Sequence, residues 1–162
     1  MADKLSLDDC QHLLRQLMAN RKILSLATLN NRRQAEASLT PFLYFESCFW
    51  VFVSHLSAHT DNLLNRPDMS LLIHADESNA KNPFVVQRLS VQCVANVVTD
   101  TRDDVMAGMQ QKLGDTVALL RQLPDFRLIR LEPQSGRFIV GFGQAYEIDF
   151  SDMSLHHINP SS

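Results

Sequence analysis

The segment Phe49-Trp-Val-Phe-Val-Ser-His-Leu-Ser-Ala-His-Thr-Asp-Asn-Leu63 begins apolar and then turns polar. Its first part, Cys48–Val53, is rich in aromatic and β-branched residues, which predicts a buried strand. Ala58–Leu64 predicts a short helix that ends at Asn65-Arg-Pro67, because the residue before a proline avoids helical backbone angles. Met69–His74 is mostly apolar again and predicts the next strand. The order here is therefore strand, polar loop, short helix, strand.

Similar patterns extend along the chain in both directions. A period of two predicts half-buried strands, and the best examples are Gln34–Thr40 and Arg88–Val98. Further strands are predicted at Ile23–Leu29, Phe126–Leu131 and Arg137–Val140, a turn at Glu132–Gly136, and helices over 7–20, 102–113 and 116–123. Antiparallel strands with short helices between them favour a mainly β (α+β) protein, built as a small barrel with peripheral helices.

The composition excludes several classes of function. Of the 162 residues, 45% are hydrophobic and 20% are charged, and the formal net charge is −3. This charge gives no nucleic-acid footprint, and no apolar run reaches the roughly 20 residues of a membrane span. We expect one domain over residues 1–150, followed by a flexible C-terminal tail at 151–162. The sequence shows no signal-peptide block and no Cys-x-x-Cys spacing, so we expect a cytoplasmic protein.

Some residue types in the polar loop invite a chemical interpretation. His55 and His59 are four positions apart and would share one face of a helix, but no Glu or Cys nearby completes a metal site. Ser54 and His55 are adjacent, and adjacent residues of a strand point to opposite faces, which disfavours a hydrolase pair. In Gly141-Phe-Gly143 the glycines permit a tight bend at the end of a strand.

Taken together and in order, several segments resemble the HugZ/HutZ-type haem-utilisation family, within the pyridoxamine-phosphate-oxidase-like FMN-binding split-barrel superfamily. These segments are Ser54–Leu63, Gln87-Arg88-Leu89, Leu123-Pro-Asp-Phe126 and Gly141-Phe-Gly-Gln-Ala-Tyr146, and the resemblance covers roughly residues 10–150. The resemblance implies a six- to seven-stranded antiparallel split β-barrel with peripheral helices. It also implies a homodimer, with the ligand in a cleft built by both subunits.

The resemblance also assigns roles to individual residues. His59 matches the second histidine of the family's Ser-His-x-x-x-His motif near the haem, and Ser54 opens the same motif, so both are expected to bind the cofactor. Arg88 matches a pocket arginine linked to haem breakdown, and it is expected both to bind the ligand and to act in catalysis. Asp125 matches a catalytic aspartate that, from one subunit, hydrogen-bonds the axial haem histidine of the other and fixes its tautomer.

A first departure from the family pattern concerns FMN. Where the related oxidases hold the FMN phosphate with Arg and Lys, this chain has Ala58 and His59 in the loop and Ser38 and Leu43 on the strands. A dianionic phosphate needs charge-assisted donors, so the substitution argues against the usual phosphate grip.

A second departure concerns the axial ligand of haem. Family members carry it in a C-terminal Gly-His motif, which is absent from the tail Leu155-His-His-Ile-Asn-Pro-Ser-Ser162. His156 and His157 are the histidines nearest in sequence to the position of that motif, and either could replace its histidine. His157 is the candidate ligand of the haem iron.

Three functions stay open on the sequence. The first is haem binding and utilisation, with oxidative haem degradation for iron release as its enzymatic form. The second is an FMN-dependent oxidoreductase of the pyridoxamine-phosphate-oxidase type, which the fold favours. The third is a haem store or carrier without turnover, which the altered tail favours. Haem is the favoured cofactor, FMN is the alternative, and whether the chain is an enzyme is left open.

Overall fold

The computed structural model describes residues 4–159; residues 1–3 and 160–162 lie outside the described part. The strands are β1 (Ile23–Leu29), β2 (Ala35–Pro41), β3 (Leu43–Phe45), β4 (Cys48–Ser54), β5 (Asp68–His74), β6 (Arg88–Val98), β7 (Phe126–Gly141), β8 (Gln144–Asp149) and β9 (Ser154–His157). The helices are α1 (Leu7–Asn20), α2 (Ala58–Asn65), α3 (Asp103–Leu113) and α4 (Thr116–Leu120), with short 3-10 turns η1 (Glu77–Asn79) and η2 (Pro83–Val85).

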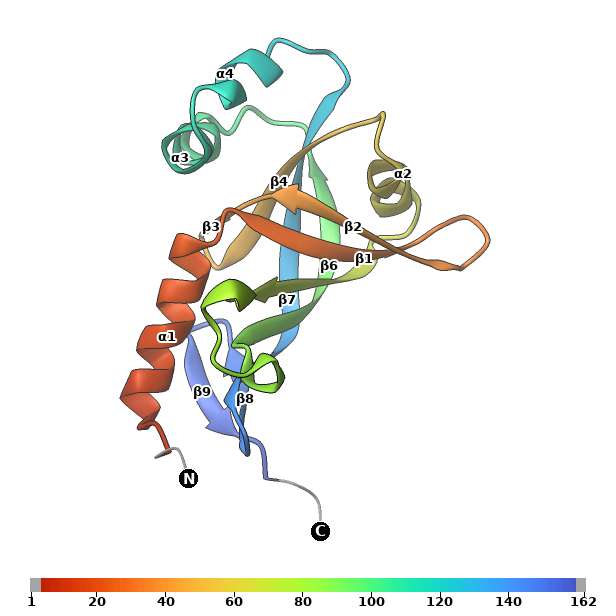
Figure 1. Cartoon of the computed structure of the whole chain (residues 1–162). Coiled ribbons are helices and arrows are strands. Elements are labelled where there is room, and N and C mark those ends of the chain that lie inside the picture. Colours follow the sequence, from red (N-terminus) through yellow and green to blue (C-terminus); the bar gives the residue numbers. More distant parts are fainter. Residues whose placement is uncertain (1–3, 160–162) are drawn as a thin grey trace.

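The strands form one antiparallel sheet that curls into a barrel (Figure 1). Its order is β2-β1-β5-β6-β7-β4-β3, and β8 and β9 continue from β7 as a hairpin. This confirms the predicted mainly β architecture with peripheral helices, although the sheet of the described chain has nine strands rather than six or seven. The additional strands are β3, β8 and β9, which are short and flank turns.

Apolar side chains from alternate positions of the strands fill the barrel. On β1 they are Leu24 and Leu26, and on β6 they are Leu89 and Val91, all nearly inaccessible to solvent. Helix α1 packs one apolar face against the same core; its buried residues are Cys10, Leu14, Leu17 and Met18. The 3.6-residue period of the helix and the two-residue period of the strands therefore meet in a single core.

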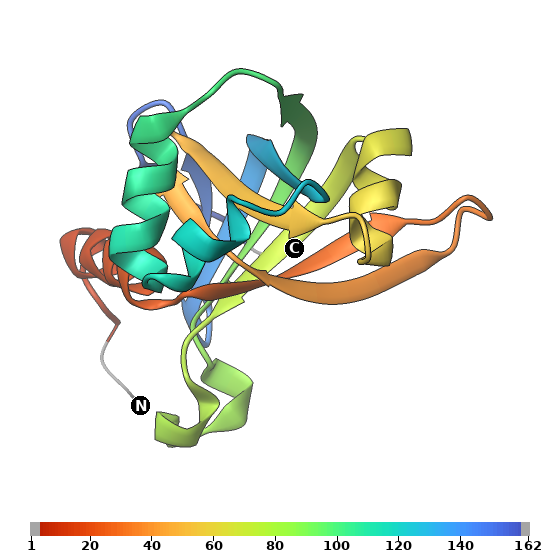
Figure 2. The same cartoon turned by 90° about the horizontal axis from the view of Figure 1, so that it is seen from above.

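Helices α3 and α4 cover the outside of the barrel at β4 and β7 (Figure 2). Trp50 on β4 is the largest residue of this second core, and its indole N–H donates to the carbonyl of Phe45 at 2.9 Å. Val105, Met106, Met109 and Val117 from the two helices pack against it. Both faces of β4 are thus buried, which explains its unbroken apolar sequence.

The predicted turn at Glu132–Gly136 was wrong, because β7 runs without interruption from Phe126 to Gly141. Proline and glycine are tolerated there for a local reason. β4 pairs with β7 only as far as Leu131, so the edge of β7 around Pro133 has no partner that needs its N–H group. On the other edge, the register with β6 shifts between Gln92 and Cys93, which is the signature of a bulge.

Part of residues 151–162, expected to form a flexible tail, belongs to the sheet. Ser154–His157 form β9, and its register with β8 places His157 opposite Tyr146 and His156 opposite Glu147. Leu155 is buried, and this anchors the strand in the barrel core. Residues 160–162 of the tail lie outside the described chain.

Strand β2 turns its polar face toward the protein. Its alternation puts Glu36, Ser38 and Thr40 on the more buried side, while Ala35, Ala37 and Leu39 are exposed. Leu39 keeps 62% of its surface accessible. An apolar face left open on an edge strand is unusual enough to need an explanation, since monomers rarely expose contiguous apolar patches.

Candidate functional site

Asp125 lies just before β7 and ties it to the end of β4. Its carboxylate accepts a hydrogen bond from the hydroxyl of Ser54, and its main-chain carbonyl accepts from the N–H of His55 at 3.0 Å. The Ser54 oxygen in turn accepts from the N–H of Leu56 at 3.0 Å. Because Ser54 pairs with Phe126 in the sheet, these contacts fix the polar loop at one end of the barrel.

His59 lies in the first turn of α2 and faces the barrel. Its Nδ1 is 3.0 Å from the hydroxyl oxygen of Ser38 on β2. Burial lowers the pKa of His59 below its usual 6.5, so the imidazole is neutral near pH 7. The next residue, Thr60, donates its hydroxyl to the Ser54 carbonyl at 2.6 Å. The structure therefore brings together Ser54, Asp125 and the helix that carries His59, although Asp125 belongs to a different sequence motif.

A polar anchor that the sequence analysis did not identify holds α2 in place. The side-chain amide of Asn62 donates to the Glu36 carboxylate at 2.8 Å and to the Thr28 hydroxyl at 3.0 Å. Glu36 also accepts from Asn30 at 2.9 Å, and these hydrogen bonds, that of Asn30 first, lower the pKa of the Glu36 carboxyl. The sequence signal for this anchor was the polar face of β2. The alternation of β2 showed that face, but it did not show that the face is turned toward the protein.

Arg88 begins β6 at the opposite end of the barrel. It lies on the strand face opposite to the buried Leu89, and its register partners are His74 on β5 and Ile139 on β7. One guanidinium nitrogen donates to the Val86 carbonyl at 3.1 Å. Within the described residues no carboxylate lies within ion-pair distance of this guanidinium, so it is a half-buried cation with donors to spare.

The two tail histidines point to opposite faces of β9. His157 stands edge-on to the ring of Tyr146 at 5.4 Å, with Nε2 3.3 Å from the Gly143 carbonyl and Nδ1 3.2 Å from the Asn159 side chain. His156 is exposed and pairs with Glu147 across the hairpin. Both lie at the end of the barrel that carries Arg88, since Ile139 pairs with Ala145 on β8.

Within one chain the expected site residues thus form two groups at opposite ends of β7. Ser54, His59 and Asp125 make one group, and Arg88 with the tail histidines makes the other. The chain as described does not bring the groups together. Among the described residues there is also no cluster of three or more His, Cys, Asp or Glu suited to a metal ion, and no helix there is long and apolar enough to span a membrane.

An open cavity lies beside the group formed by Ser54, His59 and Asp125, and the residues that line it show whether a phosphate could bind there. It is lined by Asn30, Asn31, Arg32, Gln34, Glu36, Ala58, Asp61 and Asn62. Arg32 is the cation of this set, and two carboxylates accompany it. With one arginine against two carboxylates and a neutral His59 next to it, the set has no net positive charge to offer a dianionic phosphate.

Comparison with known proteins adds a sequence match across most of the chain. Residues 11–140 match the family described as pyridoxamine 5'-phosphate oxidase. The chain is 34% identical over 143 residues to a protein named haem oxygenase HutZ from Vibrio cholerae, which covers 86% of this chain and 81% of that protein.

Solved structures give the same picture of the fold. ChuZ from Campylobacter jejuni matches 98% of this chain and 68% of its own, with a TM-score of 0.84 and 25% identity. HutZ from Vibrio cholerae, described there as a haem storage protein, matches 85% of this chain and 96% of its own, with a TM-score of 0.75 and 31% identity.

Proposed function

Because the chain belongs to the pyridoxamine 5'-phosphate oxidase family, in its HugZ/HutZ-type haem-utilisation branch, we propose that it binds haem and serves haem utilisation. The observation that carries this proposal is the 34% identity to the Vibrio cholerae haem oxygenase over most of both chains. The protein is soluble and cytoplasmic in this proposal, and haem rather than FMN is its ligand.

The residues of the chain suit a haem with its propionates. Arg88 is a half-buried guanidinium without a carboxylate partner in the described chain, which fits an anionic propionate. Neutral His59 offers one donor and one acceptor, its Nδ1 being close to the Ser38 hydroxyl. Asp125, held by Ser54, offers its remaining carboxylate oxygen as an acceptor for an imidazole N–H.

The chain acts as a homodimer in this proposal, with the haem between subunits. Two observations support it. Arg88 and Asp125 lie at opposite ends of one barrel, so a site that uses both needs a second copy. The outer face of β1 and β2 is apolar and accessible, and the side chains available for the contact are those of Ile23, Ala27, Leu29, Ala35, Ala37 and Leu39.

Bound haem would supply the iron and the conjugated ring at which an oxidative opening would take place. The chain itself would bind the haem, orient it and exclude water from it. Arg88 would hold the haem, Asp125 would orient the histidine that binds its iron, and His157 is our candidate for that histidine, with His156 the alternative. His156 shares the outer face of the sheet with Arg88, whereas His157 faces Tyr146.

FMN is less well supported as a ligand. The position that would hold its phosphate has a neutral histidine and a serine, and the cavity next to it contains two carboxylates. Yellow colour and flavin absorbance after purification would favour it, whereas a colourless preparation that ignores added FMN removes it.

The test is a haemin titration of the purified protein, followed at the Soret band. A saturable red-shifted band with one haem per subunit supports the proposal, and its absence overturns it. His157→Ala and His156→Ala identify the ligand, with His12→Ala, an exposed histidine of α1, as control. Ascorbate and oxygen then separate functions: loss of the Soret band indicates degradation, and a stable band indicates a store or carrier.

Catalysis by Arg88 is tested in the same assay. Arg88→Ala is expected to slow ascorbate-driven haem loss, while Arg121→Ala, which removes an exposed arginine just after α4, is expected to leave it unchanged. An unchanged rate in Arg88→Ala contradicts the catalytic role and leaves haem binding standing.

A further inference from the structure

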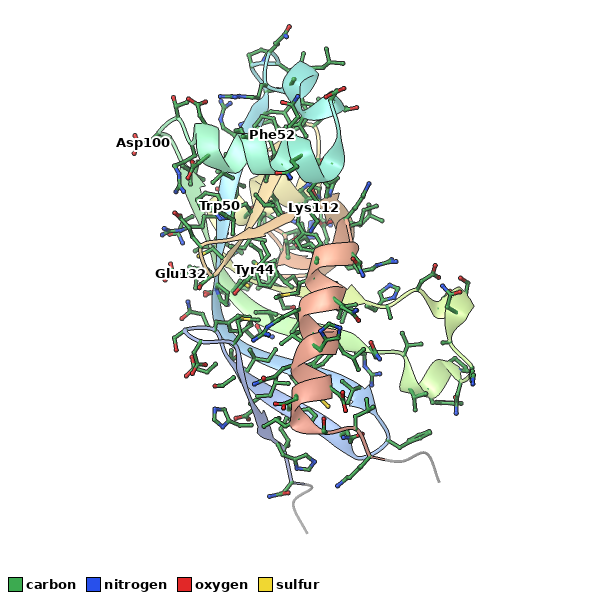
Figure 3. The ribbon with its side chains drawn as sticks, turned by 90° about the vertical axis from the view of Figure 1, so that its left-hand side faces the viewer. Tyr44, Trp50, Phe52, Asp100, Lys112 and Glu132 are labelled. Carbon is green, nitrogen blue, oxygen red and sulfur yellow. The ribbon has the colours of Figure 1, made fainter. Side chains whose placement is uncertain are left out.

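A cavity of about 320 Å³ lies between α1, β3 and the C-terminal end of α3, and none of the residues assigned to haem lines it. Its walls are mostly apolar and come from Met18, Ala19, Leu43 and Met153; three polar residues, Arg15, Tyr44 and Lys112, complete the lining. Figure 3 shows Lys112 where the end of α1 meets α3, with Tyr44 nearby. Apolar walls with a few polar groups are the usual composition of small-molecule sites.

Lys112 reaches from α3 across to the end of α1. Its Nζ donates to the carbonyl of Met18 at 3.1 Å and lies 3.8 Å from the centroid of the Phe42 ring. Burial lowers the pKa of Lys112 to about 8, which reports an ammonium partly removed from water. An ammonium has three N–H donors, so these two contacts leave it able to donate again.

Tyr44 and Arg15 add further donors at the same cavity. The Tyr44 hydroxyl donates to the thioether sulfur of Met153 at 3.2 Å, and a thioether is a weak acceptor that a carboxylate oxygen outcompetes. Burial raises the pKa of Tyr44, so it remains a neutral donor. Arg15 is exposed on α1 and contributes a second positive charge at the rim. Of the described residues that line the cavity, none is Asp or Glu.

We propose that this cavity binds a small amphipathic carboxylate. The carboxylate group accepts from Lys112, Tyr44 and Arg15, and the apolar chain lies on Met18, Leu43 and Met153. Positive charge without an acidic neighbour selects an anion, and the apolar walls select a hydrocarbon chain over a free inorganic anion. A single negative charge matches the single buried cation, since a charge left unpaired in a half-buried site is costly.

The contact of Lys112 with Met18 also has a structural role. The Met18 carbonyl belongs to the last turn of α1, whose terminal carbonyls lack partners within the helix. Replacement of Lys112 therefore risks the fit of α1 against α3, and the test must not depend on that variant alone.

Octanoate is the probe, and the readout is the NMR signal of methionine methyl groups labelled with ¹³C. Met18 and Met153 line the cavity, whereas Met69 on β5 is buried in the barrel core and serves as an internal control. We expect saturable shifts of the first two signals and none of the third. Acetate, which lacks the chain, and octylammonium, which has the opposite charge, are expected to produce no saturable shift.

Variants then assign the contacts. Lys112→Met is expected to lower the affinity for octanoate about tenfold or more, because a charge-assisted hydrogen bond is lost. Lys81→Met is its matched control. Arg15→Gln is expected to weaken it about two- to fivefold, because exposed charges contribute less, with Arg32→Gln as control. Ala19→Phe places a large side chain at an exposed position of the lining and is expected to abolish binding.

Several results overturn the proposal. These are no saturable shift in the unmodified protein, equal binding of octylammonium, or full binding in both Arg15→Gln and Ala19→Phe. The last two variants sit at exposed positions, so they stay informative if Lys112→Met does not fold. Soret titrations of the same variants are expected to match the unmodified protein, which separates this site from the haem proposal.

Discussion

Replacement of Ser54 by alanine tests the link between β4, the polar loop and Asp125. The hydroxyl makes two hydrogen bonds, one to the carboxylate of Asp125 and one from the N–H of Leu56. A hydrogen bond to a charged group contributes about 1.5–3 kcal/mol, and one between neutral groups about 0.5–1.5 kcal/mol. Asp125 is half-exposed, so water replaces part of what is lost, and we expect a net cost of about 2 kcal/mol.

The measurement is urea unfolding at one fixed protein concentration, because association would change apparent stability. A loss of about 2 kcal/mol corresponds to a melting temperature lower by about 4–8 °C for a chain of this length. Ser57→Ala is the matched control: Ser57 lies in the same loop, at the N-cap of α2, but its side chain makes no capping hydrogen bond. We expect it to change stability by less than about 0.5 kcal/mol.

A double-mutant cycle with Asp125→Asn isolates the contact between the two side chains. A coupling energy of about 1 kcal/mol is expected, because the two groups are in direct contact. The reasoning is refuted if Ser54→Ala costs no more than Ser57→Ala, or if the two substitutions are additive. Either result would mean that the loop is held by the other contacts, namely the main-chain bond from His55 to Asp125 and the bond from the Thr60 hydroxyl to the Ser54 carbonyl.

Further outcomes follow from the fold. Leu39→Lys on the open face of β2 is expected to convert a dimer to a monomer in size-exclusion chromatography with light scattering, whereas Leu119→Lys, equally exposed on α4, is not. Met109→Ala in the second core should cost about 2–5 kcal/mol in urea unfolding, against less than about 0.5 kcal/mol for Gln111→Ala, which is exposed on the same helix. The side-chain amides that donate to Glu36 lower the pKa of its carboxyl below 4.5. Its contribution to stability is therefore complete above pH 4.5 and is lost as the pH falls through the lowered pKa. Glu36→Gln should flatten the acid side of a plot of the urea midpoint against pH.

The sequence predicted the elements whose pattern is local and missed those that depend on neighbours. The long strand β6 and the helix α1 follow from their periods, and both are confirmed. Glu132–Gly136 has the composition of a turn but continues β7, because it lies where one edge of that strand is unpaired. β9 is held by pairing with β8 and by one buried leucine, neither of which a short tail sequence reveals.

The candidate site shows the same division. The motif that contains Ser54 and His59 predicted a strand followed by a polar loop and a short helix, and the structure places Ser54 at the end of β4 and His59 in the first turn of α2. The resemblance placed His59 and Ser38 at the same phosphate position, but it did not predict the hydrogen bond between them, because alternation alone does not say which face of β2 is inward. Here a polar face is inward, against the usual expectation for a half-buried strand, because α2 brings polar side chains to meet it.

The inward polar face of β2 links the position of His59 to the surface proposed for the second subunit. Side chains alternate along β2, so a shift of one residue in its register would bring Leu39 under α2 and expose Ser38. The hydrogen bonds from Asn62 to Glu36 and between His59 and Ser38 oppose this shift. They therefore hold His59 at the barrel and, by the same register, keep the apolar face of β2 outward. A contact that positions His59, the proposed ligand-binding histidine, thus also presents the surface on which a second subunit would complete the proposed site.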